Sequence, residues 1–209
     1  MSHPELALIL MLLAAPPMAA EDQYFDSAGV RLRYVVEGSG EPVVLIHGFA
    51  GNLEGATGIT AALAADYRVI ALDVRGHGKS GKPHDPAAYG QPMADDVVRL
   101  LDHLGIQKAH VVGYSMGGRI AMMLLALRPE RLLTATIGGT GWLDREALEA
   151  RRVTLDRTAE SLEQGKGFAP LILSLVPPSM PTPTEDQIAA LSSRLLAGND
   201  PVALAAVAR

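Results

Sequence analysis

The sequence predicts an α/β fold: a doubly wound, mostly parallel β-sheet with helices on both faces, followed by a helical cap region. Three observations predict it. Short apolar runs rich in β-branched residues recur between residues 42 and 137, which is typical of buried strands. Segments with helical spacing of apolar residues alternate with these runs, as expected for a parallel sheet. After Gly141 the strand-like runs cease.

The strands are predicted from local pattern. Residues 24–37 predict a β-hairpin, because two strand-like runs flank the turn sequence Asp26-Ser27-Ala28-Gly29. We expect four further, buried strands, at 42–46, 67–72, 109–112 and 132–137. No strand-like run follows the last of them, so it is expected to form an open edge of the sheet.

The helices of the core are predicted from spacing. The clearest covers residues 93–104, where apolar residues recur at three- and four-residue intervals and Gly105 ends the pattern. The small residues of 55–65 are compatible with a helix. Another is expected at 115–127, ending before Pro129.

Residues 142–209 are expected to form a helical cap or lid on a core of residues 21–141. The helical segments are 142–165, 185–197 and 200 onward. Between them, residues 170–183 carry five prolines around an apolar stretch. The last helix has a start signal in Asp200 but no stop signal before Arg209, which predicts a cap that is cut short.

Composition and charge limit the function classes. The formal net charge is −5 and aromatic residues make up 4% of the 209 residues. Both values argue against nucleic-acid binding, which requires clustered cations and stacking rings. The absence of cysteine excludes disulfides, thiolate metal sites and a cysteine nucleophile. We expect a small-molecule partner and no stable membrane span, while the oligomeric state stays open.

The N-terminus predicts a signal peptide over residues 1–20. Leu6 to Ala15 is an apolar run too short to span a bilayer, and small residues lead to a cleavage site near Ala20. This indicates a secreted or periplasmic protein. However, no basic residue precedes Arg31, so an N-terminal extension that packs on a cytoplasmic domain is the alternative.

The strongest chemical signal is Gly113-Tyr114-Ser115-Met116-Gly117, a G-x-S-x-G between a predicted strand and a predicted helix. A serine on such a sharp turn adopts strained backbone angles, and flanking glycines avoid collisions. The turn presents the hydroxyl at a helix N-terminus, where developing negative charge is favoured. We predict Ser115 as a nucleophile; the structural alternative is a tight turn that closes a βα unit.

A second signal, His47-Gly48-Phe49, follows the predicted strand 42–46. A loop at that position can offer a backbone N–H facing the serine. The N–H groups of Phe49 and Met116 are the predicted oxyanion hole.

The run from Asp73 to Ser80, D-V-R-G-H-G-K-S, is read as structural. Asp73 and Arg75 are expected to brace a turn whose glycines permit tight backbone. The run also resembles a phosphate-binding glycine loop, but it lacks the residue order of a P-loop.

Together these motifs, HG-x, D-x-RGHG-x-S and G-x-SMGG, resemble the esterase and lipase-like branch of the α/β-hydrolase superfamily over residues 24–141. The resemblance implies a sheet of eight strands, of which about six are present. It also implies a serine hydrolase that cleaves carboxylic esters through an acyl-enzyme, without metal or cofactor. Dehalogenases and epoxide hydrolases on this fold use an aspartate at the elbow, and Ser115 argues against both.

In this family the triad runs Ser, then Asp or Glu, then His, and no histidine follows Ser115 here. Because a serine hydroxyl needs an adjacent base, we expect the chain alone to be inactive. It is either a fragment of a longer enzyme, which the unfinished helix and open edge favour, or a short form without catalysis. Asp144 is the candidate acid, and His47 is an alternative base that the motif makes improbable.

Rival functions share the same scaffold. Lactonase, C–C hydrolase and cofactor-free perhydrolase activities use a similar elbow, and substrate choice depends on cap and pocket. A rival of another class is a non-catalytic protein that binds a small ligand.

Overall fold

The computed structural model describes residues 21–209, so the predicted signal peptide lies outside the described residues. It contains one six-stranded sheet with the strand order β1-β2-β4-β3-β5-β6. The strands are β1 (Gln23–Ser27), β2 (Val30–Glu37), β3 (Glu41–Ile46), β4 (Tyr67–Leu72), β5 (Ala109–Tyr114) and β6 (Leu132–Gly138). The pairs β4–β3, β3–β5 and β5–β6 are parallel, whereas β1–β2 and β2–β4 are antiparallel. The predicted mostly parallel sheet is confirmed.

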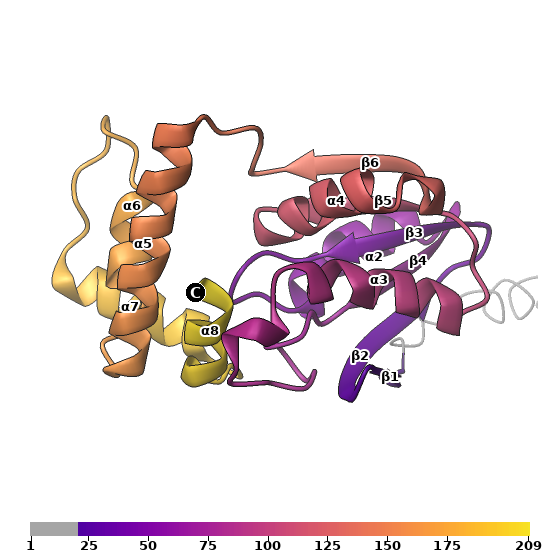
Figure 1. Ribbon diagram of the computed structural model, residues 1–209, viewed down its shortest axis with the longest axis horizontal. Coiled ribbons are helices and arrows are strands. Elements are labelled where there is room, and N and C mark those ends of the chain that lie inside the picture. The colour runs from indigo at the N-terminus through magenta and orange to yellow at the C-terminus, as the bar shows by residue number, and fades with distance from the viewer. Residues whose placement is uncertain (1–20) are drawn as a thin grey trace, which may run out of the picture.

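Helices cover both faces of this sheet (Figure 1). One face packs on α3 (Gln91–His103) and α4 (Met116–Leu127), and the other on α2 (Thr57–Leu63) with the short helix η1 (Leu53–Ala56). Two further short helices are η2 (Pro86–Ala88) and η3 (Pro129–Arg131). Because alternate side chains of a strand point to opposite faces, the central strands contribute to both cores. In β3, for example, Val44 and Ile46 lie in one core and Val43 and Leu45 in the other.

The region after the sheet is helical, as predicted. It consists of α5 (Arg145–Glu163), α6 (Ala169–Ser174), α7 (Glu185–Leu196) and α8 (Pro201–Ala208). These helices lie beyond the end of the sheet toward which the β6 arrow points (Figure 1). The sequence analysis assigned no helix to the proline-rich stretch 170–183, yet α6 forms at its start, because proline is well tolerated in the first turn of a helix.

The cap has a small apolar core of its own, which includes residues from the loop after β3. Phe168 and Leu204 are fully buried in it, and Ala50 and Phe49 from the loop after β3 pack against them. The ring centroids of Phe49 and Phe168 lie 5.8 Å apart in an edge-to-face arrangement. The cap is therefore seated on the loop that carries the HGF motif.

Local capping sets where the cap helices begin. Asp144 and Asp200 accept backbone N–H bonds at the starts of α5 and α8, and Thr184 forms a capping box with Gln187 at the start of α7.

In the core, β6 pairs on one side only, with β5, and forms an edge of the described sheet.

Candidate active site

Ser115 occupies the turn between β5 and α4 in a strained backbone conformation. Its φ and ψ are 53° and −108°, a region that residues with a side chain rarely adopt. The turn is held by two backbone bonds: Ser115 N–H donates to the Gly138 carbonyl at 2.8 Å, and Arg119 N–H donates to the Ser115 carbonyl at 3.1 Å. The predicted helix 115–127 thus begins one residue later, with Ser115 as its N-cap.

The two glycines of the motif are required by close backbone approach. A Cβ atom at Gly113 would lie 2.1 Å from the carbonyl oxygen of Gly117, and one at Gly117 would lie 2.1 Å from that of Ile46. Backbone atoms at these distances cannot move aside cheaply. The glycines therefore allow the turn after β5 to pack directly on the end of β3.

The loop after β3 lies against Ser115. A Cβ atom at Gly48 would be 3.4 Å from the Cβ of Ser115. The loop closes with a bond of 3.0 Å from Gly51 N–H to the Gly48 carbonyl. Among the described residues, the N–H groups of Phe49 and Met116 have no hydrogen-bond partner, which leaves both predicted donors free for a ligand.

His47 is engaged by backbone on both sides of its ring. Nδ1 lies 2.8 Å from the Gly48 carbonyl, and Nε2 accepts from Val74 N–H at 3.0 Å. Burial lowers the pKa of His47, against the opposing effect of the Gly48 carbonyl. His77, whose ring centroid is 5.2 Å from that of His47, is fully buried. Burial, then the charge of His47, lowers the pKa of His77 to about 3.

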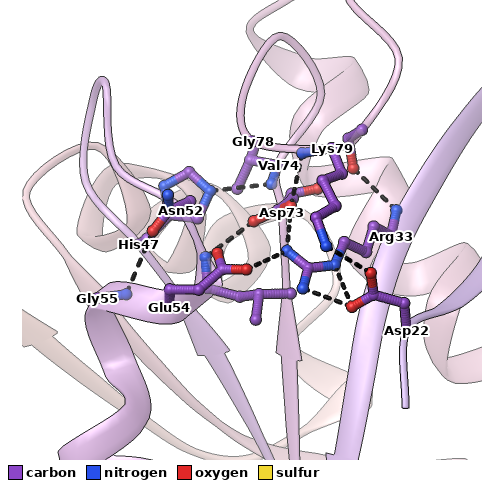
Figure 2. Close-up of polar contacts among 12 residues, drawn as sticks. Asp22, Arg33, His47, Asn52, Glu54, Gly55, Asp73, Val74, Gly78 and Lys79 are labelled. Carbon is purple, nitrogen blue, oxygen red and sulfur yellow. Dashed lines mark hydrogen bonds and ion pairs between the residues drawn. The ribbon is translucent and has the colours of Figure 1, made fainter. Parts of the chain in front are cut away.

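Asp73 braces the neighbouring loops, as the sequence predicted (Figure 2). Its carboxylate accepts from the N–H groups of Leu53 and Lys79, both at 2.8 Å, and from Arg33 Nη1 at 3.1 Å. Arg33 also contacts Glu54 and Asp22 (Figure 2). The predicted role of Arg75 differs in detail, because this side chain reaches into the core to pair with Asp96 on α3. Neither residue faces the cavity described next.

A cavity of about 540 Å³ lies between the sheet domain and the cap. From the sheet domain it is lined by Gly48, Phe49, Tyr114, Ser115 and Gly139, and from the cap region by Leu143, Ala147, Ala150, Arg151, Thr154, Leu155, Leu171, Ser174, Leu175 and Leu195. The cavity thus unites Ser115 with the predicted oxyanion loop under a mainly apolar roof. A pocket of this size suits a small organic molecule.

Sequence reasoning missed the residues of this roof. Ala147, Ala150, Arg151 and Thr154 recur at helical spacing within the predicted helix 142–165 and share one face of α5. That spacing was available as a signal. Which face of a charged helix turns toward a cavity is decided by tertiary packing, however.

Asp144, the candidate acid, is exposed and lies at the start of α5. Its carboxylate accepts from Ala147 N–H at 2.8 Å. This contact makes Asp144 the N-cap of α5.

Within residues 21–209, no group of three or more histidine or carboxylate side chains is arranged to hold a metal ion. None of the helices in this range has the length and apolarity needed to cross a bilayer.

Comparison with known proteins agrees with this geometry. The family model described as "alpha/beta hydrolase fold" matches residues 41–163, from β3 to the end of α5. The chain belongs to the α/β-hydrolase fold family. The match includes both the HGF loop and the serine turn.

Relatives in this α/β-hydrolase family differ in their described functions. The chain is 42% identical over 120 residues to the dihydrolipoyllysine-residue acetyltransferase component of an acetoin cleaving system from Cupriavidus necator, covering 57% of this chain and 32% of that protein. It is 41% identical over 91 residues to the esterase YbfF of Escherichia coli, covering 44% and 35%. The matched part thus spans about a third of the length of these curated relatives.

Solved structures show the same fold. An epoxide hydrolase from Vigna radiata superposes with a TM-score of 0.71 at 20% identity, covering 93% of this chain and 72% of that one. At 20% identity, this similarity shows a shared fold and nothing about function.

Proposed function

We propose that Ser115 is the nucleophile of a serine hydrolase that acts on carboxylic esters. The observation that carries this proposal is the positive φ of Ser115 at a turn that opens into the cavity. Strained residues of this kind cluster at functional sites, where the surrounding structure holds them in place. The esterase from Escherichia coli, 41% identical over 91 residues, supports the same reaction class.

The reaction would proceed through an acyl-enzyme. Ser115 Oγ attacks the ester carbonyl and loses its proton to a base, while the N–H groups of Phe49 and Met116 hold the oxyanion. The C–O bond to the alcohol then breaks, and the alcohol leaves with that proton. Water attacks the acyl group, which departs as a carboxylic acid, and Ser115 regains its proton.

The base is the missing participant. No histidine follows Ser115 in the 209 residues, and His47 has both ring nitrogens bonded to backbone. We propose that these 209 residues alone turn over little or no ester, and that a histidine and an acid outside them complete the triad.

Covalent labelling with a fluorophosphonate, in buffer with and without imidazole, tests the proposal. Imidazole can replace the absent base, so labelling is expected to fall on Ser115 and to rise with imidazole concentration. Mass spectrometry of the labelled peptide identifies the serine. Ser115→Ala is expected to abolish labelling, whereas Ser174→Ala, at another serine that lines the same cavity, leaves it unchanged.

Two outcomes count against this function. Labelling spread over several serines would show that Ser115 has no special reactivity. No labelling at any imidazole concentration would favour a non-catalytic protein that binds a small ligand. Lactonase, C–C hydrolase and perhydrolase activities use the same serine turn as esterase activity. Once Ser115 is established as the labelled serine, assays with the substrate of each activity distinguish among them.

A further inference from the structure

The cavity beside Ser115 contains one unpaired charge. Of the described residues that line it, only Arg151 carries a charge at neutral pH, and most of the others are apolar. Its Nε atom is buried without a hydrogen-bond partner. Within residues 21–209, no carboxylate forms an ion pair with Arg151.

The two arginines that are buried almost completely, Arg33 and Arg75, are both paired. Arg33 contacts three carboxylates, and Arg75 is bonded to Asp96. Removing a guanidinium donor from water without giving it an acceptor is costly, so such groups are normally satisfied. On the solvent side of the same helix, Arg152 pairs with Glu149. Arg151, on the side that lines the cavity, has no such partner among the described residues.

A second arginine lies beside it. Arg119, four residues after Ser115 on α4, lines an adjoining cavity of about 370 Å³, and Leu143 lines both cavities. Within the described part of the chain, Arg119 forms no ion pair either. Burial lowers the pKa of both arginines, and the charge of Arg151 lowers that of Arg119 further. Two like charges thus face a shared region with no acid between them.

From this arrangement we infer that the ligand carries an anionic oxygen group, a carboxylate or a phosphate, which Arg151 binds with Arg119 nearby. The guanidinium fork matches the oxygens of either group. The remainder of the ligand is apolar, because side chains such as Leu155, Leu171 and Leu195 fill the rest of the lining. On the proposed function, on which this inference rests, the substrate is an ester with an anionic end held in the cap and its carbonyl at Ser115.

The 209-residue chain and three six-carbon probes test the inference: hexanoate, hexyl phosphate and the neutral hexanamide. Isothermal titration calorimetry is expected to give tighter binding for at least one anion than for hexanamide. The tighter of the two anions identifies the group that the site prefers. If neither anion binds more tightly than hexanamide, the inference is overturned, and this comparison requires no variant.

Matched variants then locate the site. Arg151→Gln is expected to weaken binding of the preferred anion about tenfold or more, because the variant loses a charge-assisted hydrogen bond to the anion. The same variant leaves hexanamide binding unchanged. Arg152→Gln removes an exposed charge from the next position and is expected to change neither affinity. Equal losses in the two variants would show general attraction by surface charge and would overturn the inference.

These titrations do not depend on reactivity at Ser115. Anion binding that requires Arg151, without fluorophosphonate labelling at Ser115, would contradict the proposed hydrolase alone. Labelling at Ser115 without a preference for the anionic probes would contradict the anion site alone.

Discussion

The Nε2 atom of His47 accepts a hydrogen bond of 3.0 Å from the backbone N–H of Val74. Its Nδ1 atom can then carry the proton and donate to the Gly48 carbonyl at 2.8 Å. The two bonds define a neutral ring, with the tautomer inferred from its partners. They join the loop after β3 to the loop after β4. His47 is thus interpreted as the anchor of the predicted oxyanion loop, and no ring nitrogen is left over for Ser115.

The buried histidines predict that stability falls in mild acid. The pKa values of His47 and His77 are lowered in the folded protein, mainly by burial, whereas an unfolded histidine has a pKa near about 6.5. Below that pH the unfolded chain takes up protons that the folded chain does not. The free energy of unfolding therefore decreases as pH falls below about 6.5. For His77 the decrease is about 1.4 kcal/mol per pH unit and continues toward its folded pKa of about 3, and His47 adds to it in the same direction.

Urea denaturation at several pH values between 7 and 5 measures this slope. His77→Asn is expected to reduce it, because one of the two histidines no longer titrates. A free energy of unfolding that stays constant over this range would contradict the buried, neutral state of His47 and His77.

The close approach at Gly117 predicts a severe effect of adding one methyl group. In Gly117→Ala the new Cβ would meet the Ile46 carbonyl oxygen at 2.1 Å, and β3 has no room to retreat within the sheet. We expect a loss of about 3 kcal/mol or more in the free energy of unfolding. Chemical denaturation followed by circular dichroism measures it.

The matched control is Gly58→Ala, at an exposed position of α2, where a Cβ would meet no atom within 4 Å. It is expected to stabilise the protein by about 0.5–1 kcal/mol, because alanine is the better helix former. Similar effects at the two positions would indicate that the turn after β5 does not pack on β3 as described.

The sequence was most informative where one physical cause dominates. The strand from Tyr67 to Leu72 was predicted with its observed ends, since it is buried on both faces and bounded by polar residues. The G-x-S-x-G spacing predicted the strained turn, because only glycines fit beside Ser115. In both cases local sequence and tertiary packing favour the same structure.

The sequence was least informative in the cap. The six-residue helix α6 was not predicted, because proline ends some helices and begins others, so the prolines of 170–183 gave no clear signal. Arg151 was one of several charges on a predicted helix. Only the packing of α5 over the sheet domain distinguishes it from Arg152, which faces solvent. Such distinctions depend on contacts between segments far apart in the chain.

The cap position of Asp144 predicts a graded response to substitution. Asp144→Ala removes the acceptor for Ala147 N–H and is expected to lower the free energy of unfolding by about 1 kcal/mol. Asp144→Asn is expected to cost less, since asparagine caps helices comparably well. Thermal denaturation of the two variants measures the difference. If Asp144→Asn left stability intact but abolished fluorophosphonate labelling at Ser115, the residue would be the acid of the triad rather than a cap alone.

The buried pair between Arg75 and Asp96 predicts the largest electrostatic effect in the core. Asp96 is fully buried and accepts from Arg75 Nε at 2.6 Å and from the Ser27 hydroxyl at 2.5 Å. In Asp96→Asn the Arg75 charge stays in the core without its counter-charge, so we expect a loss of about 3–5 kcal/mol in the free energy of unfolding. Urea denaturation at pH 7 measures it. Glu149→Gln, which breaks the exposed pair with Arg152, is the control and is expected to cost about 0–1 kcal/mol. Comparable losses in the two variants would show that the carboxylate of Asp96 contributes no more than a surface ion pair does.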